Sequence, residues 1–152
     1  CALTFGGILE STGMLGVIAG SILKLAVNTG SLVLATVLSC FTVNLITGEQ
    51  YLSIVIPGRM YKDAYAERGL APVNLSRALE DSGTITSPLI PWNTCGAFMY
   101  GTLGVHPFAY APYAFLNIIN PFVSIFYGFT GITMIKMTEE EKAAYAASKL
   151  HA

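Results

Sequence analysis

The stretch Leu79-Glu-Asp-Ser-Gly-Thr-Ile-Thr-Ser-Pro-Leu-Ile-Pro-Trp-Asn-Thr-Cys-Gly96 carries the most information about how this chain folds. It opens with acids and hydroxyl side chains and then places Pro88 and Pro91 within one helical turn of each other. Proline has no amide donor, so it leaves an upstream carbonyl without its helical partner. We therefore predict a discontinuous or re-entrant helix, broken at these two prolines.

Oxygen-bearing side chains surround the predicted break at Thr86, Ser87, Asn93 and Thr94. A small hard cation needs such oxygens, together with free carbonyls, in place of its hydration shell. Irregular backbone at membrane depth is tolerated only where protein or a wet cavity covers it. The stretch is thus predicted to line an ion-binding site. The competing interpretation is a kinked helix whose Ser and Thr side chains bond back to their own backbone.

Two carboxylates are candidates for coupling a cation to a proton. Asp81 stands just before the break, where a single carboxylate can hold a cation or a proton but not both, which is the simplest physical basis for antiport. The competing interpretation pairs Asp81 with Arg77, four residues earlier on the same helix face. Glu10 is the one acid in the apolar run near the N-terminus, and acids inside a membrane are costly and usually functional. Alternatively, that segment is interfacial and Glu10 faces water.

The composition agrees with a membrane location. Of 152 residues, 53% are hydrophobic and 11% are charged, whereas soluble domains carry roughly 25% charged residues. Residues 25–47 and 82–135 contain no Asp, Glu, Lys or Arg, which predicts membrane segments. The net charge of −1 gives no basic field for nucleic acid. The three cysteines are widely spaced and form no metal-ligand or disulfide pattern, and no nucleotide loop or catalytic motif indicates an enzyme.

We expect an all-α, polytopic membrane protein with about four membrane segments. The expected segments are residues 2–23, 27–46, 85–105 and 108–135. The segment at 27–46 also carries Thr36, Ser39, Thr42 and Asn44, for which hydrogen bonding between helices is the favoured role. Asn44 is in addition a candidate ion ligand.

The remaining residues are expected outside the bilayer. Residues 48–82 are predicted to be a polar loop with a turn at Pro57-Gly58. Within it we expect a short amphipathic helix from Arg59 to Arg68, ended by Gly69, and a further helix capped by Asn74 and stopped by Gly83. Residues 136–152 are predicted to be a solvated tail whose helix begins with a capping box of Thr138 and Glu141. Seven of the eight basic residues then share one side, with Lys24 opposite, so loop and tail are predicted to be cytoplasmic.

Three stretches strongly resemble the NhaC family of Na⁺/H⁺ antiporters: Phe5-Gly-Gly-Ile-Leu-Glu10, Ile46 to Arg59, and Gly69 to Gly96. The resemblance covers nearly the whole chain up to the tail. It implies a multi-span transporter of the ion-transporter superfamily type, in the plasma (inner) membrane, that exchanges cytoplasmic Na⁺ for external H⁺. It implies no cofactor and no metal beyond the transported Na⁺.

The chain begins with Cys rather than Met, and no signal-peptide n-region precedes its first apolar run. We interpret residues 1–135 as the C-terminal membrane part of such an antiporter. Its partners would be the remaining N-terminal part, the lipid bilayer and, in a homo-oligomer, a second copy. Two other functions stay open: a Na⁺-dependent organic-acid (malate/lactate) antiporter, which resembles a branch of the same family, and a non-transporting truncated membrane subunit.

Overall fold

The computed structural model describes residues 4, 8, 11–24, 26–142 and 145. Within these ranges the chain forms helices and short connections, with one isolated β-bridge between Leu70 and Lys136. The helices are α2 (Met14–Leu23), α3 (Thr29–Thr47), α4 (Gln50–Glu67), α5 (Pro72–Leu79), the π-helix η1 (Glu80–Thr84), the 3-10 helix η2 (Ser87–Leu89), α6 (Thr94–Leu103), α7 (Pro107–Tyr110), the 3-10 helix η3 (Ala111–Tyr113) and α8 (Phe115–Thr130). The predicted all-α class is confirmed for the described residues.

Helix α3 lies at the centre of the fold and matches the segment expected at 27–46. Its 19 residues give a length of about 28 Å, close to the roughly 30 Å of a bilayer core. At its start the Asn28 N–H donates to Ser31 Oγ over 2.7 Å. It ends at Gly48, whose φ of 64° is a left-handed conformation that favours glycine.

Among the described residues, α3 is the one unbroken helix that is long and apolar enough to cross a membrane. The run Pro107–Tyr113 and helix α8, which are bent by 60° relative to each other, would together count as a second span. The expected count of four segments is therefore not confirmed. Much of the segment expected at 2–23 lies outside the described residues, and its described helix, α2, has 10 residues.

The expected polar loop at 48–82 is mostly helical, and the helix predicted from Arg59 to Arg68 forms the second half of α4. Helix α4 passes straight through Pro57-Gly58, so the predicted turn there is wrong. A proline inside a helix removes one hydrogen bond, here to Ser53, and Pro57 is fully buried. Gly58 allows α5 to pack closely, because a Cβ at this position would lie 3.2 Å from Leu79 Cδ1. Packing thus outweighs the local turn signal.

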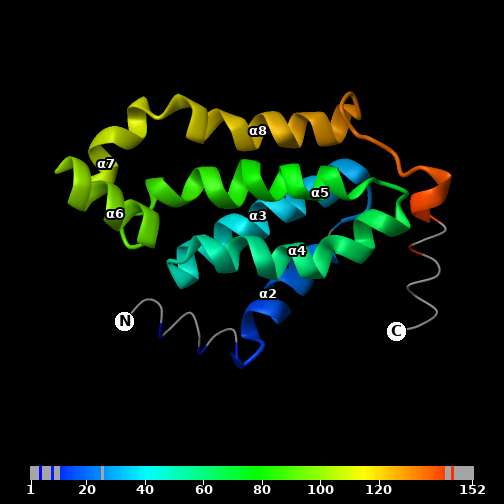
Figure 1. Cartoon of the computed structure of the whole chain (residues 1–152), viewed down its shortest axis with the longest axis horizontal. Helices are drawn as coiled ribbons and strands as arrows, with labels where there is room; N and C mark the ends of the chain where they lie inside the picture. Colours follow the sequence, from blue (N-terminus) through cyan, green and yellow to red (C-terminus); the bar gives the residue numbers. More distant parts are fainter. Residues whose placement is uncertain (1–3, 5–7, 9–10, 25, 143–144, 146–152) are drawn as a thin grey trace.

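Helix α4 returns along α3 to one end of the molecule, which we call the basic end. Here Arg68 Nη2 donates to the Ala26 carbonyl over 2.5 Å, and Lys136 faces Leu70 in the β-bridge. Lys24 caps α2 two residues before Ala26, so it lies at this end and not opposite to Arg68 as predicted. Figure 1 shows the start of α3, the end of α4, the start of α5 and the end of α8 together at this end.

The helix that carries the deciding stretch is continuous from Pro72 to Leu89 through α5, η1 and η2. It does not begin at Asn74 or stop at Gly83, so both of those predictions are wrong. The Asn74 amide instead donates to the Ile135 carbonyl over 2.6 Å and accepts from the Ile135 N–H over 3.0 Å. Gly83 lies inside the π-helix, where a Cβ would stand 3.1 Å from side-chain atoms of Ser53 and Ile54. Glycine here permits close contact with α4.

The predicted break is confirmed: residues 90–93 interrupt the helix before α6. The chain turns back so tightly that a Cβ on Gly96 would lie 2.1 Å from the Ile90 carbonyl oxygen. Two hydrogen bonds attach the break to the end of α3, from Trp92 Nε1 to the Leu45 carbonyl over 2.8 Å and from the Thr94 N–H to the Gly48 carbonyl over 2.9 Å.

Hydroxyl pairs join α3 to α4. Ser39 Oγ lies 2.7 Å from the Tyr61 hydroxyl, and Thr36 Oγ1 lies 3.1 Å from the Tyr65 hydroxyl, with all four residues buried. The predicted interhelical role is thereby confirmed for Thr36 and Ser39. Thr42 does not share it, since its hydroxyl donates to the Leu38 carbonyl of its own helix.

Helix α8 packs on α3 and carries many exposed apolar side chains on its outer side. Close packing depends on Gly128, because a Cβ there would lie 2.8 Å from Val33 Cβ. The exposed apolar residues of α8 are Phe115, Leu116, Ile118, Ile119, Phe122, Phe126 and Phe129. An outward surface of this kind, without a charged residue, suits contact with lipid.

The tail begins as predicted. The Thr138 N–H donates to Glu141 Oε2 over 2.9 Å, and the Glu141 N–H donates to Thr138 Oγ1 over 3.3 Å, which is the reciprocal bonding of a capping box. Residues 143–144 and 146–152 lie outside the described residues.

Candidate ion-binding site

Asp81 occupies the π-helix η1 near the middle of the long helix, and its carboxylate is held by α8. The Asn120 amide donates from Nδ2 to Asp81 Oδ1 over 2.6 Å, and the Ser124 hydroxyl donates to Asp81 Oδ2. Asp81 is half-buried and Ser124 is buried. Short π-helical turns inside α-helices occur frequently at functional sites. Both carboxylate oxygens are thus paired with uncharged donors from a single neighbouring helix.

A polar stripe on α8 provides these donors. Asn117, Asn120 and Ser124 are spaced three and four residues apart, so they share one helix face. Asn117 donates from Nδ2 to the Ile85 carbonyl over 2.7 Å. Sequence reasoning missed all three residues. Their signal was present as polar residues at helical spacing within the uncharged run 108–135.

On the opposite side of the long helix, Asn44, Thr86 and Asn93 form a buried cluster. Asn44 Nδ2 donates to the Gly83 carbonyl over 2.7 Å and to Thr86 Oγ1 over 3.3 Å. Asn93 Nδ2 donates to Asn44 Oδ1 over 3.0 Å. The structure therefore brings together three of the predicted site residues.

The amide oxygens in this buried cluster are already engaged. Asn44 Oδ1 accepts from Asn93, and Asn93 Oδ1 accepts from the Cys95 N–H over 3.0 Å. Asn44 is also bonded through its nitrogen, so its amide is fixed at both ends. These contacts hold the break against α3 and leave little freedom to turn an oxygen toward a ligand.

The other predicted residues of the break, Ser87 and Thr94, tie it to the connection between α3 and α4. Ser87 Oγ donates to the Thr84 carbonyl over 2.9 Å and to Gln50 Oε1 over 3.3 Å. Cys95 Sγ donates to the same Gln50 oxygen over 2.7 Å. Thr94 takes part through its backbone N–H. Gln50 was not predicted, because its partners are distant in the sequence.

Neither the ion pair with Arg77 nor the role of Glu10 gains support. Arg77 Nη2 donates to the Thr133 carbonyl over 3.1 Å, and the ion pair found among the described residues joins Lys142 to Glu139. Glu80 is exposed and accepts from Thr84 Oγ1 over 2.9 Å. Glu10 lies outside the described residues.

The long helix offers a set of oxygens suited to a hard cation. They are the Asp81 carboxylate and the carbonyls of Gly83 and Ile85, each of which accepts a hydrogen bond from an amide of α3 or α8. Oxygen donors of this kind suit hard cations such as Na⁺ or Ca²⁺. In the part of the chain that the structure describes, no three His, Cys, Asp or Glu side chains come together to hold a metal ion.

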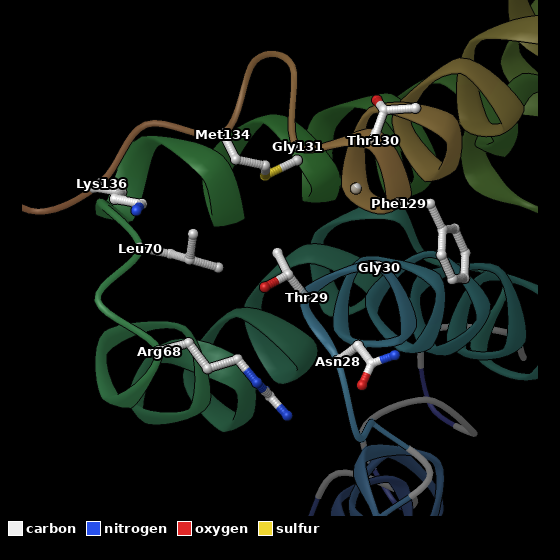
Figure 2. Close-up of a pocket in the computed structure, with 11 residues that line it drawn as sticks. Asn28, Thr29, Gly30, Arg68, Leu70, Phe129, Thr130, Gly131, Met134 and Lys136 are labelled. Carbon is white, nitrogen blue, oxygen red and sulfur yellow. The ribbon is translucent and has the colours of Figure 1, made fainter.

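One cavity lies at the basic end of the molecule and another borders this region. One, of about 410 Å³, opens at the basic end beside the start of α3 and the end of α8 (Figure 2). Its charged lining residues are Arg68 and Lys136, which disfavours a cation there. The other, of about 400 Å³, lies between α3, the long helix and α8. Its lining is apolar except for polar atoms of Ser82, Thr86 and Asn117.

Uncharged apolar helices, a broken helix and a carboxylate bound by neutral donors are features that ion-coupled membrane transporters combine. A model described as the Na⁺/H⁺ antiporter family matches residues 1–132. The chain therefore belongs to the Na⁺/H⁺ antiporter family, and membership places it in the membrane as part of a multi-pass transporter.

Relatives with assigned names share this stretch of sequence. The chain is 44% identical over 131 residues to the Na⁺/H⁺ antiporter NhaC of Alkalihalophilus pseudofirmus, covering 86% of this chain and 28% of the relative. It is 43% identical over 146 residues to the arginine/ornithine antiporter ArcD of Halobacterium salinarum, covering 96% and 30%. It is 36% identical over 129 residues to the malate-2H⁺/Na⁺-lactate antiporter of Bacillus subtilis, covering 85% and 28%.

All three named relatives are antiporters and none is named as an enzyme. The chain spans about three tenths of their length. No solved structure matches the chain.

Proposed function

We propose that this chain is part of a secondary transporter that exchanges Na⁺ for H⁺ across the plasma membrane, with Asp81 as the group for which the two ions compete. The supporting observation is the environment of Asp81, a half-buried carboxylate in a π-helical turn whose two oxygens accept, within the described part of the chain, from the uncharged donors Asn120 and Ser124. Relatives named Na⁺/H⁺ antiporters, at 44% and 45% identity, favour these two ions.

Competition at one carboxylate gives exchange without further machinery. A proton on Asp81 removes the negative charge that attracts Na⁺, and Na⁺ at Asp81 disfavours the proton. Exchange follows when the protein can switch between two conformations with either ion bound at Asp81. It must switch poorly when Asp81 binds neither ion. A charged group without its ion is costly to move through a bilayer, which supplies that restriction.

The residues around Asp81 divide into two proposed roles. The side chains of Asn120 and Ser124 lie where they could complete the shell of a cation at Asp81. Asn44, Thr86, Ser87, Asn93 and Thr94 are proposed to hold the broken helix in shape, since their bonds run to the protein itself. Glu10 remains a second candidate carboxylate.

We further propose that the basic end faces the cytoplasm. Lys24, Arg68, Arg77 and Lys136 gather there, and basic residues are enriched on the cytoplasmic side of membrane proteins. The test is labelling of single cysteines placed at Lys136 and at Gly104 with a membrane-impermeant thiol reagent in a background where Cys1, Cys40 and Cys95 are replaced. Labelling of position 136 only in everted vesicles, and of 104 only in intact cells, is expected. The reverse pattern would invert the orientation.

Everted vesicles that contain the full-length protein test the exchange itself. A proton gradient is established and followed with a pH-sensitive dye, and Na⁺ is then added to the parent and to Asp81→Asn. Collapse of the gradient in the parent and not in the variant is expected. Normal exchange in a well-folded Asp81→Asn protein contradicts the role of Asp81.

The same vesicles test a second function. The relative named a malate-2H⁺/Na⁺-lactate antiporter favours exchange that also requires an organic acid. If Na⁺ alone leaves the gradient unchanged and Na⁺ with malate or lactate collapses it, organic-acid exchange replaces the first proposal. The same experiment with arginine and ornithine tests the function named for the relative from Halobacterium salinarum.

A further inference from the structure

Among the described residues the Asn120 amide bonds to Asp81 through its nitrogen only, whereas the amide oxygens of Asn44 and Asn93 are both engaged. We infer that Asn120 selects the cation at the proposed site by turning its side-chain amide, donating to Asp81 in one state and presenting its oxygen to the ion in the other. Ser124 supports it with a hydroxyl that can donate or accept. The inference rests on the proposed function, because it specifies how Asp81 would distinguish its ions.

The direction of the Asn120 amide in this structure follows from chemistry. The amide nitrogen lies 2.6 Å from Asp81 Oδ1 and donates to it, which is the orientation that suits a carboxylate in its hydrogen-bond-accepting form. A cation bound beside the same oxygen would be repelled by that NH₂ group, because the NH₂ hydrogens carry positive partial charge. A half turn of the amide would replace this repulsion with an oxygen ligand for the cation.

Rotation of the amide is a small change. The terminal torsion of an asparagine is broad and roughly two-fold, so a half turn exchanges oxygen for nitrogen without moving the helix. Within the described residues the Asn120 amide is hydrogen-bonded through Nδ2 only. Asn120 is also half-buried, whereas Asn44 is fully buried and bonded through both its oxygen and its nitrogen. The structure therefore leaves Asn120 free to turn and holds Asn44 in place.

Asn117 provides a matched control one turn away. It is the same residue type on the same face of α8, and its Nδ2 also donates to an oxygen of the long helix. Its acceptor, however, is the Ile85 backbone carbonyl and not a titrating group. A loss of packing or of helix attachment should affect both positions, whereas a loss of ion selection should affect only Asn120.

The experiment measures apparent KM for Na⁺ and for Li⁺, and the pH profile of exchange, in everted vesicles with full-length parent, Asn120→Ala, Asn120→Asp and Asn117→Ala. Asn120→Ala removes one oxygen ligand and is expected to raise the apparent KM for Na⁺ about tenfold. The apparent KM for Li⁺ is expected to change by a different factor, because the smaller ion contacts each ligand at a different distance. Asn117→Ala is expected to keep the pH profile and the ratio of the two KM values.

Asn120→Asp supplies oxygens in every orientation and adds a negative charge beside Asp81. Exchange is expected to persist, with the apparent KM for Na⁺ at or below that of the parent at alkaline pH. The pH profile should move to higher pH, because the added charge favours the protonated form of the pair. A purely structural role for Asn120 predicts neither change.

Folding is checked separately from transport. The thermal midpoint of each purified variant is measured with and without Na⁺, since a bound ion stabilises the folded state. A smaller Na⁺-dependent shift in Asn120→Ala than in Asn117→Ala is expected. If Asn120→Ala does not fold, Asn120→Ser replaces it, and the same loss of the Na⁺-dependent shift is expected.

The outcomes separate the two proposals. Normal exchange in Asp81→Asn overturns the proposed role of Asp81 and this inference with it. An inactive Asp81→Asn together with unchanged Na⁺ KM, Li⁺ KM and pH profile in Asn120→Ala overturns only the inference. Equal changes in Asn120→Ala and Asn117→Ala also overturn it, since they indicate general damage to α8.

Discussion

The helix from Pro72 to Leu89 has two polar sides, and they are built in opposite ways. The side toward α3 meets Asn44 and Asn93, which are neutral, fully buried and bonded to one another. The side toward α8 carries Asp81, a half-buried carboxylate that accepts from Asn120 and Ser124. A saturated buried network makes a rigid attachment, whereas a partly exposed carboxylate can exchange partners. The first side is suited to holding the break in place and the second to changing state.

The largest effect on function is expected from Asp81→Asn. The change is nearly isosteric, removes the charge for which the two ions would compete, and keeps an oxygen to accept from Asn120. Na⁺-driven proton exchange should be lost, while the amount of folded protein and its thermal midpoint stay close to those of the parent. Dye fluorescence in vesicles and thermal unfolding in detergent measure the two quantities. Unfolding of the variant would show that Asp81 has a structural role, as proposed for Asn44 and Asn93.

The largest effect on stability is expected from Gly96→Ala. The added Cβ would lie 2.1 Å from the Ile90 carbonyl oxygen, so the break must open or shift. A cost of about 2 kcal/mol or more is expected from overpacking, with a matching fall in the thermal midpoint. Gly101→Ala is the matched control, because nothing lies within 4 Å of its added Cβ. Equal midpoints for the two variants would show that the break is not tightly constrained.

Asn44→Ala should destabilise the protein by about 2 kcal/mol. It leaves the Gly83 carbonyl and the Asn93 amide without their buried partner, which costs more than the loss of one exposed bond. The pH profile of the remaining exchange is expected to match the parent, since Asn44 does not contact Asp81. A displaced pH profile in a variant of normal stability would show that Asn44 takes part in ion coupling.

The smallest effect is expected from Arg77→Gln. Arg77 donates to the Thr133 carbonyl beyond α8, so its loss should lower stability by about 1 kcal/mol or less. Because Arg77 does not pair with Asp81, the pH profile of exchange should stay in place. A clear displacement of that pH profile would support the alternative hypothesis that Arg77 and Asp81 form an ion pair.

Local patterns predicted the parts of the fold that depend on local chemistry. The uncharged run of α3 requires an apolar environment, and its predicted limits of 27–46 differ little from Thr29–Thr47. The prolines at 88 and 91 cannot donate backbone hydrogen bonds, and two of them three residues apart weaken a helix more than the single Pro57 that α4 contains. The capping box of Thr138 and Glu141 likewise involves neighbours only. Asp81 was identifiable as a carboxylate next to the break.

Only the tertiary structure decided how those parts meet. Pro57 and Gly83 look like helix stops, yet both lie inside helices, because close packing between α4 and the long helix compensates for weak local preference. Asn120 and Ser124 stand 39 and 43 residues from Asp81, and no local pattern specifies which residues of α8 face it. The sequence by itself determined that the chain is helical, apolar and broken near an acid. The packing of α8 and α3 on either side of one helix decided which polar residues are fixed and which can change partners.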